Sequence, residues 1–192
     1  MKPLRIVIKA LSISVFVFFA GSLFISKKFF LERNVFVEVS DTTAFKFAAD
    51  YRQFNLWNPY FDEDPDANYT VIGSPGNNGQ ALSWDGKVIG KGKFEFVSQE
   101  PYKALYQKAV VENPVSGSFD NNMYFFKAYK GTIVTWTLSG ECHSVIDKWK
   151  SLFYDITIGE DCQTGLDKFK EELESQELSK SYSKSDNESA SL

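Results

Sequence analysis

The sequence VIDKWKSLFYDITIGEDCQTGLDKFKEEL, residues 145–173, decides the fold. Its apolar side chains recur at three- and four-residue intervals, at Val145, Ile146, Trp149, Leu152, Phe153, Ile156, Leu166, Phe169 and Leu173. This spacing predicts a long helix with one apolar face, interrupted near Gly159 and Gly165. Such a helix is not stable by itself in water, so the rest of the chain must supply a broad apolar surface to receive it.

Residues 68–139, which precede this helix, read as a series of antiparallel strands. Turn signals lie at residues 73–79, at 85–86, near Pro101, at 113–120 and at 130–131. Two strands alternate clearly: Gly92, Phe94 and Phe96 oppose Lys91, Lys93 and Glu95, and Val134, Trp136 and Leu138 oppose Thr135, Thr137 and Ser139. A period of two predicts one dry face of the sheet, which we expect to meet the helix.

Shorter elements come before these strands. Residues 34–40 alternate and predict a first strand, and Asp41-Thr42-Thr43 supplies helix N-caps for a helix over residues 44–52. Residues 54–60 contain Pro59 and predict a turn of helix followed by a bend. The acidic run at residues 62–66 lacks the ligand spacing of a calcium loop and predicts a solvated loop.

Residues 6–25 are apolar apart from Lys9 and a few small residues. Twenty residues rising 1.5 Å each match a hydrocarbon core of about 30 Å, so Ile6–Ile25 is predicted to be a membrane-spanning helix. The alternative is a cleaved signal peptide, with Ala20-Gly21-Ser22 as the cleavage site. We favour a retained anchor because the apolar run continues beyond that site. The charges that flank the span are nearly balanced and do not decide its orientation. The free amino terminus and the resemblance to signal anchors favour a single-pass protein whose domain lies outside the cytoplasm, on the periplasmic side.

The predicted organisation has three parts: a membrane anchor at residues 1–28, one domain at 29–174, and a polar, disordered tail at 175–192 that is rich in Ser, Glu and Lys. The middle part, roughly 140 residues, is long enough to bury a sizeable core. The chain carries a net charge of −4 and shows no concentrated basic face, which argues against nucleic acid as a partner. One histidine and two cysteines are too few side chains for a typical zinc site, so no metal or other cofactor is expected.

Several motifs are typical of one superfamily by their order and spacing. They are Ala44-Phe45-Lys46-Phe47 through Trp57-Asn58-Pro59, Ser83-Trp84-Asp85-Gly86 with Gly90-Lys91-Gly92, the strand at residues 132–141, and the glycine-containing helix at 158–173. Together they resemble the SRPBCC superfamily (START-like, polyketide cyclase/dehydrase branch) over residues 34–173. The chain departs from the pattern at Cys142-His143, where a Pro-Phe pair is more typical.

The resemblance implies an α+β helix-grip fold. In that fold a curved antiparallel sheet of about six or seven strands wraps around a long C-terminal helix, here preceded by one transmembrane helix. The resemblance also implies a cavity between sheet and helix that holds a hydrophobic ligand. The candidate wall residues are aromatic: Trp84, Phe94, Phe96, Tyr106, Tyr124, Phe126, Trp136, Trp149 and Phe153. The alternative for these residues is an ordinary filled core.

Candidate catalytic groups are scarce. His143 has no second histidine, and no Ser, Cys or Asp lies at a recognisable motif spacing from it, so no catalytic residue is assigned. Cys142 and Cys162 lie at the end of a strand and on the helix. In an oxidising compartment they are able to form a disulfide, which in the chain-entropy model contributes about 3 kcal/mol, and in the cytoplasm they are two buried thiols.

The favoured function is a membrane-tethered module that binds a lipid or another hydrophobic small molecule. One alternative is an enzyme of cyclase or dehydratase type, in which Tyr, Asp or His carries protons inside the same pocket. Another is a scaffold that recruits a protein partner of unknown identity to the membrane. A cavity with a carboxylate or His143 beside Tyr106 or Tyr124 favours the enzyme, and an exposed apolar patch without a cavity favours the scaffold.

Overall fold

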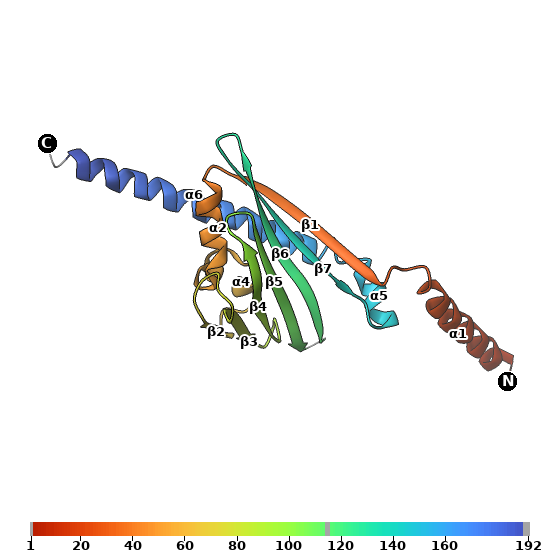
Figure 1. The fold of residues 1–192 in the computed structure, drawn as a ribbon. Helices are drawn as coiled ribbons and strands as arrows, with labels where there is room; N and C mark the ends of the chain where they lie inside the picture. The colour runs from red at the N-terminus through yellow and green to blue at the C-terminus, as the bar shows by residue number, and fades with distance from the viewer. Residues whose placement is uncertain (1, 114–115, 190–192) are drawn as a thin grey trace.

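The computed structural model describes residues 2–113 and 116–189. Within these residues the chain forms one antiparallel sheet with the strand order β1-β7-β6-β5-β4-β3-β2 (Figure 1). Its seven strands are β1 (Lys28–Val37), β2 (Asn68–Ile72), β3 (Ala81–Asp85), β4 (Lys91–Glu100), β5 (Ala104–Asn113), β6 (Gly117–Ala128) and β7 (Gly131–Glu141). The sheet curves, and its inner face meets the C-terminal helix, as predicted for a helix-grip fold.

The helices connect and cover this sheet. They are α1 (Lys2–Gly21), α2 (Asp41–Ala49), the 3-10 turn η1 (Tyr51–Gln53), α3 (Phe54–Trp57), α4 (Tyr60–Glu63), α5 (Val145–Ser151) and α6 (Ile158–Ser189). The chain passes from β1 at one edge of the sheet through α2–α4 to β2 at the other edge. It then returns strand by strand to β7, which pairs with β1.

The alternation in the strand sequences determines which side chains form the core. In β4, Gly92, Phe94 and Phe96 are buried, as predicted. In β7, Val134 and Trp136 are buried as predicted, but Thr135 and Thr137, which were expected on the wet face, are buried too, and Leu138 is only half-buried. Helix α2 begins at Asp41, earlier than expected, because Ser40 is its N-cap: the Ser40 hydroxyl accepts a hydrogen bond of 3.1 Å from the Thr43 amide.

Helix α6 contributes the centre of the core. Cys162, Leu166, Phe169 and Leu173, which share one helical face, are all buried. The Phe169 ring packs edge-on against Phe47 and Trp57, with ring centroids 5.1 and 5.3 Å away. α6 therefore holds α2 and α3 against the sheet.

The single long helix predicted from Val145 is wrong in its first half. α5 ends at Ser151, and α6 begins only at Ile158. Between them the Phe153 amide donates to the Lys150 carbonyl and the Ile156 amide to the Phe153 carbonyl, a three-residue spacing that interrupts the α-helical ladder. The apolar side chains of this part point to solvent instead of the core.

The polar tail also differs from its prediction of disorder, since α6 continues to Ser189. Residues 174–180 are Glu, Ser, Gln, Leu and Lys, most of which have high helix propensity, and short-range pairs such as Gln176 with Glu172 and Lys180 with Glu177 support the helix. Burial ends earlier: Leu173 is the last buried residue among the described side chains of α6.

The N-terminal helix has the same length as the predicted span over residues 6–25, 20 residues, but it lies four residues nearer the N-terminus. α1 ends at Gly21 because the Leu23 and Phe24 amides donate to carbonyls three residues back, in turn geometry. None of the helices among the residues that the structure describes combines the length and the apolar character needed to cross a membrane.

We expect Phe169→Ala to lower the free energy of unfolding by about 3–5 kcal/mol, because the Phe169 side chain is fully buried and its loss leaves a cavity between α6, Phe47 and Trp57. Urea unfolding of the full chain, followed by tryptophan fluorescence, measures the change. Leu178→Ala, at an exposed position on the same helix, is the matched control and should change stability by less than about 0.5 kcal/mol. Equal effects at the two positions would contradict the packing of α6 described above.

Candidate ligand-binding site

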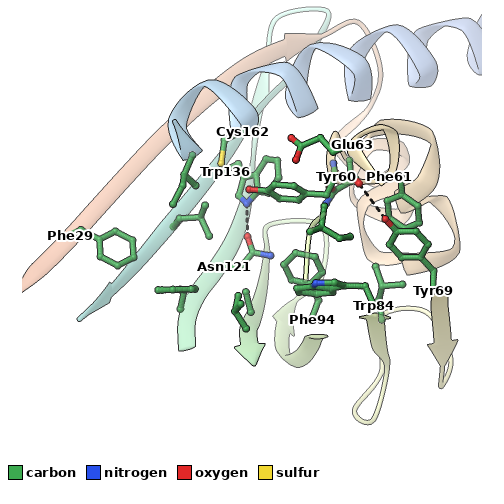
Figure 2. Close-up of a pocket in the computed structure, with 18 residues that line it drawn as sticks. Phe29, Tyr60, Phe61, Glu63, Tyr69, Trp84, Phe94, Asn121, Trp136 and Cys162 are labelled. Atoms are coloured by element: carbon green, nitrogen blue, oxygen red, sulfur yellow. Dashed lines mark hydrogen bonds between the residues drawn. The ribbon is translucent and has the colours of Figure 1, made fainter. Parts of the chain in front are cut away.

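A cavity of about 240 Å³ lies inside the domain, between the inner face of the sheet, the α3–α4 segment and the first turn of α6 (Figure 2). Its lining is almost entirely apolar, and it is smaller than a typical drug-sized site of about 300–1,000 Å³. The residues that line it are Phe29, Asn58, Tyr60, Phe61, Glu63, Tyr69, Leu82, Trp84, Ile89, Phe94, Ala109, Val111, Phe119, Asn121, Trp136, Leu138, Ile158 and Cys162.

Trp84 reaches the cavity because its neighbour across the strands is a glycine. Trp84 pairs with Gly92 in the β3–β4 ladder, and a Cβ atom at position 92 would lie 2.4 Å from Cζ2 of the Trp84 ring and 2.5 Å from the Val110 carbonyl oxygen. The close packing at this position therefore requires a residue without a Cβ atom. Trp84 also packs against Phe94, with ring centroids 5.0 Å apart.

Trp136 forms a fixed wall on β7. Its indole Nε1 donates a hydrogen bond to Asn121 Oδ1 (Figure 2). Asn121 Nδ2 donates in turn to Gln107 Oε1 at 3.2 Å, so a buried polar chain links three adjacent strands. The Trp57 ring packs edge-on against Trp136 at 5.5 Å. A buried network of this kind holds its side chains in one arrangement.

Asn58 supplies an unsatisfied hydrogen-bond donor in the lining. The residue is 2% exposed, and its Oδ1 accepts a hydrogen bond of 3.1 Å from the Tyr60 amide, which fixes the orientation of the side-chain amide. Its Nδ2 has no hydrogen-bond partner among the described residues. A buried donor without a partner costs about 1–3 kcal/mol, so an acceptor atom in the cavity would be stabilised there.

The other polar groups come from α4. Tyr60 extends across the cavity towards Trp136, and the Glu63 carboxyl group lies above it (Figure 2). Burial, and then the charge of Asp161, raise the pKa of Tyr60, and the same two causes in the same order raise the pKa of Glu63. Burial, followed by the charge of Glu160, raises the pKa of Asp161 itself. These carboxyl groups therefore keep their protons to a higher pH than free ones do.

The loop after α4 is anchored more firmly than predicted. The Tyr69 hydroxyl donates to the carbonyls of Tyr60 and Asp64, both at 3.2 Å, and its ring stacks on Phe61 with centroids 3.9 Å apart. Asp64, within the acidic run, is buried, and its Oδ2 accepts a hydrogen bond of 2.7 Å from the Val88 amide. The prediction of a freely solvated loop at residues 62–66 is wrong for Asp64.

Of the nine predicted wall residues, the structure brings three to the cavity: Trp84, Phe94 and Trp136. Phe96 is buried in the core but does not line this cavity. Tyr106, Tyr124 and Phe126 lie on the outer face of the sheet, where Tyr106 donates to Glu100 and packs against Tyr124. In β6 the inward residues are the alternate ones, Phe119, Asn121, Met123 and Phe125.

Trp149 and Phe153 lie outside the site as well, because the helix is interrupted between α5 and α6. His143 is exposed in the segment after β7 and does not line the cavity. Some lining residues that were not predicted lie on strands and follow the period-two pattern, which could have identified them: Leu82, Ala109, Phe119 and Leu138. The lining residues of the α3–α4 segment lie on short turns that carry no periodic signal.

Both cysteines are free thiols in the structure, and both are buried. The disulfide weighed for Cys142 and Cys162 is therefore not formed: Cys142 follows β7, and Cys162 lies on α6, beyond α5 and the intervening turn. Burial, followed by the charge of Asp161, raises the pKa of the Cys162 thiol to about 12, and Arg33 partly offsets this. Cys162 is thus a neutral, weakly nucleophilic part of the cavity wall.

We expect Cys162 to resist thiol reagents in the folded protein. With a pKa of about 12 the thiolate fraction at pH 8 is about a thousandfold below that of an ordinary thiol of pKa ~8.5. Reaction of the Cys142→Ser variant with 5,5′-dithiobis(2-nitrobenzoate) at pH 8 should therefore be at least a thousandfold slower without urea than in 8 M urea, which unfolds the chain. Comparable rates in the two conditions would show that Cys162 is not buried.

Comparisons with known proteins bear on the fold. No family model matches this chain, and no curated protein does. Among solved structures it is similar to protein SA2116 of unknown function from Staphylococcus aureus, with a TM-score of 0.61, 11% identity, and 79% of this chain and 96% of that one covered.

Two further structures agree with this one over the same region. The di-domain ARO/CYC StfQ from the steffimycin biosynthetic pathway has a TM-score of 0.57 at 12% identity and covers 78% of this chain and 51% of its own. Ara h 8.0201 has a TM-score of 0.53 at 8% identity and covers 77% of this chain and 99% of its own. The chain therefore has the SRPBCC-type, START-like fold that its sequence motifs resemble.

Proposed function

We propose that this protein binds a small hydrophobic molecule that carries at least one hydrogen-bond acceptor, in the cavity between the sheet and α6. The observation that carries the proposal is the unpaired, buried Asn58 Nδ2 in a largely apolar lining. The apolar walls supply affinity through burial of the ligand, and this unpaired donor orients it. The solved structures of this fold, which include ARO/CYC proteins and Ara h 8.0201, are consistent with a ligand-binding module.

The size of the cavity restricts the ligand further. A volume of about 240 Å³ corresponds to about eight water molecules at ~30 Å³ each. This space suits a compact ring system or a single short chain, and a lipid with two long acyl chains does not fit inside it. The proposed ligand class is therefore a small aromatic or alicyclic compound with a carbonyl or hydroxyl oxygen.

We also propose that residues 6–25 attach the protein to a membrane, with the domain outside the cytoplasm. Support comes from α1, whose large apolar side chains at Ile6, Leu11, Ile13, Phe16 and Phe19 are all more than half exposed. Exposure of so many apolar side chains to water is unfavourable, and a hydrocarbon surrounding removes that cost. A protein attached in this way sediments with the membrane fraction and is released from it by detergent.

A second candidate function is acid–base catalysis in the same cavity. Tyr60 and Glu63 favour it, because a tyrosine and a carboxyl group with raised pKa values line one cavity together. A protonated Glu63 is able to donate a proton to a ligand oxygen, and its carboxylate to accept one. Conversion of a bound aromatic ketone or hydroxyketone by the wild type, but not by Glu63→Gln, would favour the enzyme over the binding module.

The site itself is tested by filling it. We expect Ala109→Phe to abolish binding of 2-acetylnaphthalene, or to weaken it at least tenfold, because the Ala109 side chain lines the cavity between Phe94 and Phe119 on the neighbouring strands. Lys108→Phe adds the same ring at the adjacent, outward position and should leave binding unchanged.

Binding is measured by isothermal titration calorimetry of the full chain in lipid nanodiscs, with empty nanodiscs as the blank. Circular dichroism confirms that both variants fold, because overpacking of a core costs about 1–3 kcal/mol. No saturable heat with the wild type, for this ketone and a panel of short fatty acids and sterol fragments, would refute the proposed function.

The role of Asn58 is tested by a variant of the same shape. Asn58→Asp keeps the oxygen that accepts from the Tyr60 amide and replaces only the free Nδ2 donor. The wild type should prefer 2-acetylnaphthalene over 2-ethylnaphthalene, which lacks the acceptor, by about tenfold, the worth of one buried hydrogen bond. At a pH at which the new carboxyl group is ionised and cannot donate, Asn58→Asp should no longer prefer the ketone. A preference that persists at that pH would assign the acceptor contact to another group.

A further inference from the structure

A group of large apolar side chains on and after α5 faces away from the core. Ile146, Leu152, Phe153 and Ile156 are between 54% and 61% exposed, and α5 contains no buried residue. With the half-buried Trp149 they form what we call the α5 face. Soluble domains seldom expose so many neighbouring apolar side chains unless another molecule covers them.

The α5 face is fixed to the end of α1. The Trp149 ring stacks on Phe18 with centroids 5.4 Å apart and planes 14° from parallel, and its Nε1 donates to the Phe18 carbonyl oxygen at 3.3 Å. Lys148 Nζ donates to the Ser22 carbonyl oxygen at 3.0 Å. A Cβ atom at Gly21 would lie 3.0 Å from the Trp149 ring, so α5 and α1 approach closely.

The apolar surface is continuous across this contact. Leu23 and Phe24, which follow α1 directly, are 79% and 92% exposed. Figure 1 shows α5 at the end of the sheet beside the segment that leads out of α1. The exposed apolar side chains of α1, of residues 23–24 and of α5 therefore follow one another at one end of the molecule.

The charges around the α5 face are arranged for an anionic surface. Asp147 is held in the capping box, where its Oδ2 accepts from the Ser144 amide at 3.0 Å, and Asp155 forms an ion pair with Arg33 at 2.8 Å. Lys148 and Lys150 occupy the last turn of α5 and add positive charge beside the apolar side chains. Tryptophan and lysine beside exposed aliphatic and phenylalanine side chains are typical of helices that lie in a membrane interface.

We propose that the α5 face docks onto the surface of a lipid bilayer, as a second contact beside α1. The proposal rests on the membrane attachment proposed above, since α1 places the α5 face where a membrane-spanning or membrane-embedded helix leaves the lipid. Ile146, Leu152, Phe153 and Ile156 enter the boundary between headgroups and acyl chains, Trp149 lies at the level of the headgroups, and the two lysines contact lipid phosphates.

Docking of this kind brings the bilayer close to the cavity. Tyr154, the neighbour of Phe153 in the chain, packs edge-on against Phe29 with ring centroids 5.0 Å apart, and Phe29 lines the cavity. Ile158, at the start of α6, lines it too. Two rings in contact, Tyr154 and Phe29, thus connect the α5 face to the cavity wall.

The test places a fluorescent label on the proposed contact. Phe153→Cys and, separately, Ile156→Cys are labelled with a nitrobenzoxadiazole dye on the full chain, whose native cysteines are buried. Ile72→Cys, on the edge strand β2 and 57% exposed, is the matched control. Each protein is reconstituted into phosphatidylcholine–phosphatidylglycerol vesicles with or without brominated acyl chains, which quench only dyes inside the bilayer.

Loss of fluorescence in brominated vesicles at positions 153 and 156, but not at 72, is the expected result. Equal fluorescence at all three positions in protein that floats with the vesicles would overturn the docking while leaving the attachment intact. Protein that does not float would overturn both. Shielding of the dye without bromine quenching, together with a doubled mass in cross-linking, would assign the α5 face to a second copy of the chain and overturn the proposal.

Discussion

Burial of one side of α6 against α2, α3 and the sheet is the constraint on which the rest of the structure depends. Leu166, Phe169 and Leu173 fill the space in front of β1 and the two short helices. Towards the N-terminal end of α6 the helix contributes only Ile158 and Cys162, which border the interior without filling it. The cavity is the part of the concave sheet that this helix does not reach.

A network of hydrogen bonds holds one side of the cavity, and the other side carries most of its polar groups. The chain of hydrogen bonds from Trp136 through Asn121 to Gln107 fixes the wall on the central strands. The opposite side is made by α4, whose position depends on Tyr69 and on the buried Asp64. Most of the polar groups in the lining therefore come from a short segment, residues 58–64, which is held in place by contacts that are remote in the chain.

Whether a part of the structure could be predicted depends on whether its sequence pattern is local in the chain. The strand alternation is local and strong, so the sheet, its dry face and three of the cavity residues, Trp84, Phe94 and Trp136, follow from the sequence. The interruption after α5 does not, because the apolar period continues through it and only the contacts of Trp149 with α1 and of Arg33 with Asp155 show that this half packs elsewhere. The positions of Tyr60 and Asn58 depend on tertiary hydrogen bonds that no periodic pattern records.

The glycine at position 92 has a consequence for the shape of the cavity. Because the Trp84 indole packs directly against the backbone here, a methyl group at this position would clash with the ring and with the Val110 carbonyl oxygen, so the ring or the strand pairing would have to shift. The shape of the cavity thus depends on one residue of the neighbouring strand, which does not itself line the cavity.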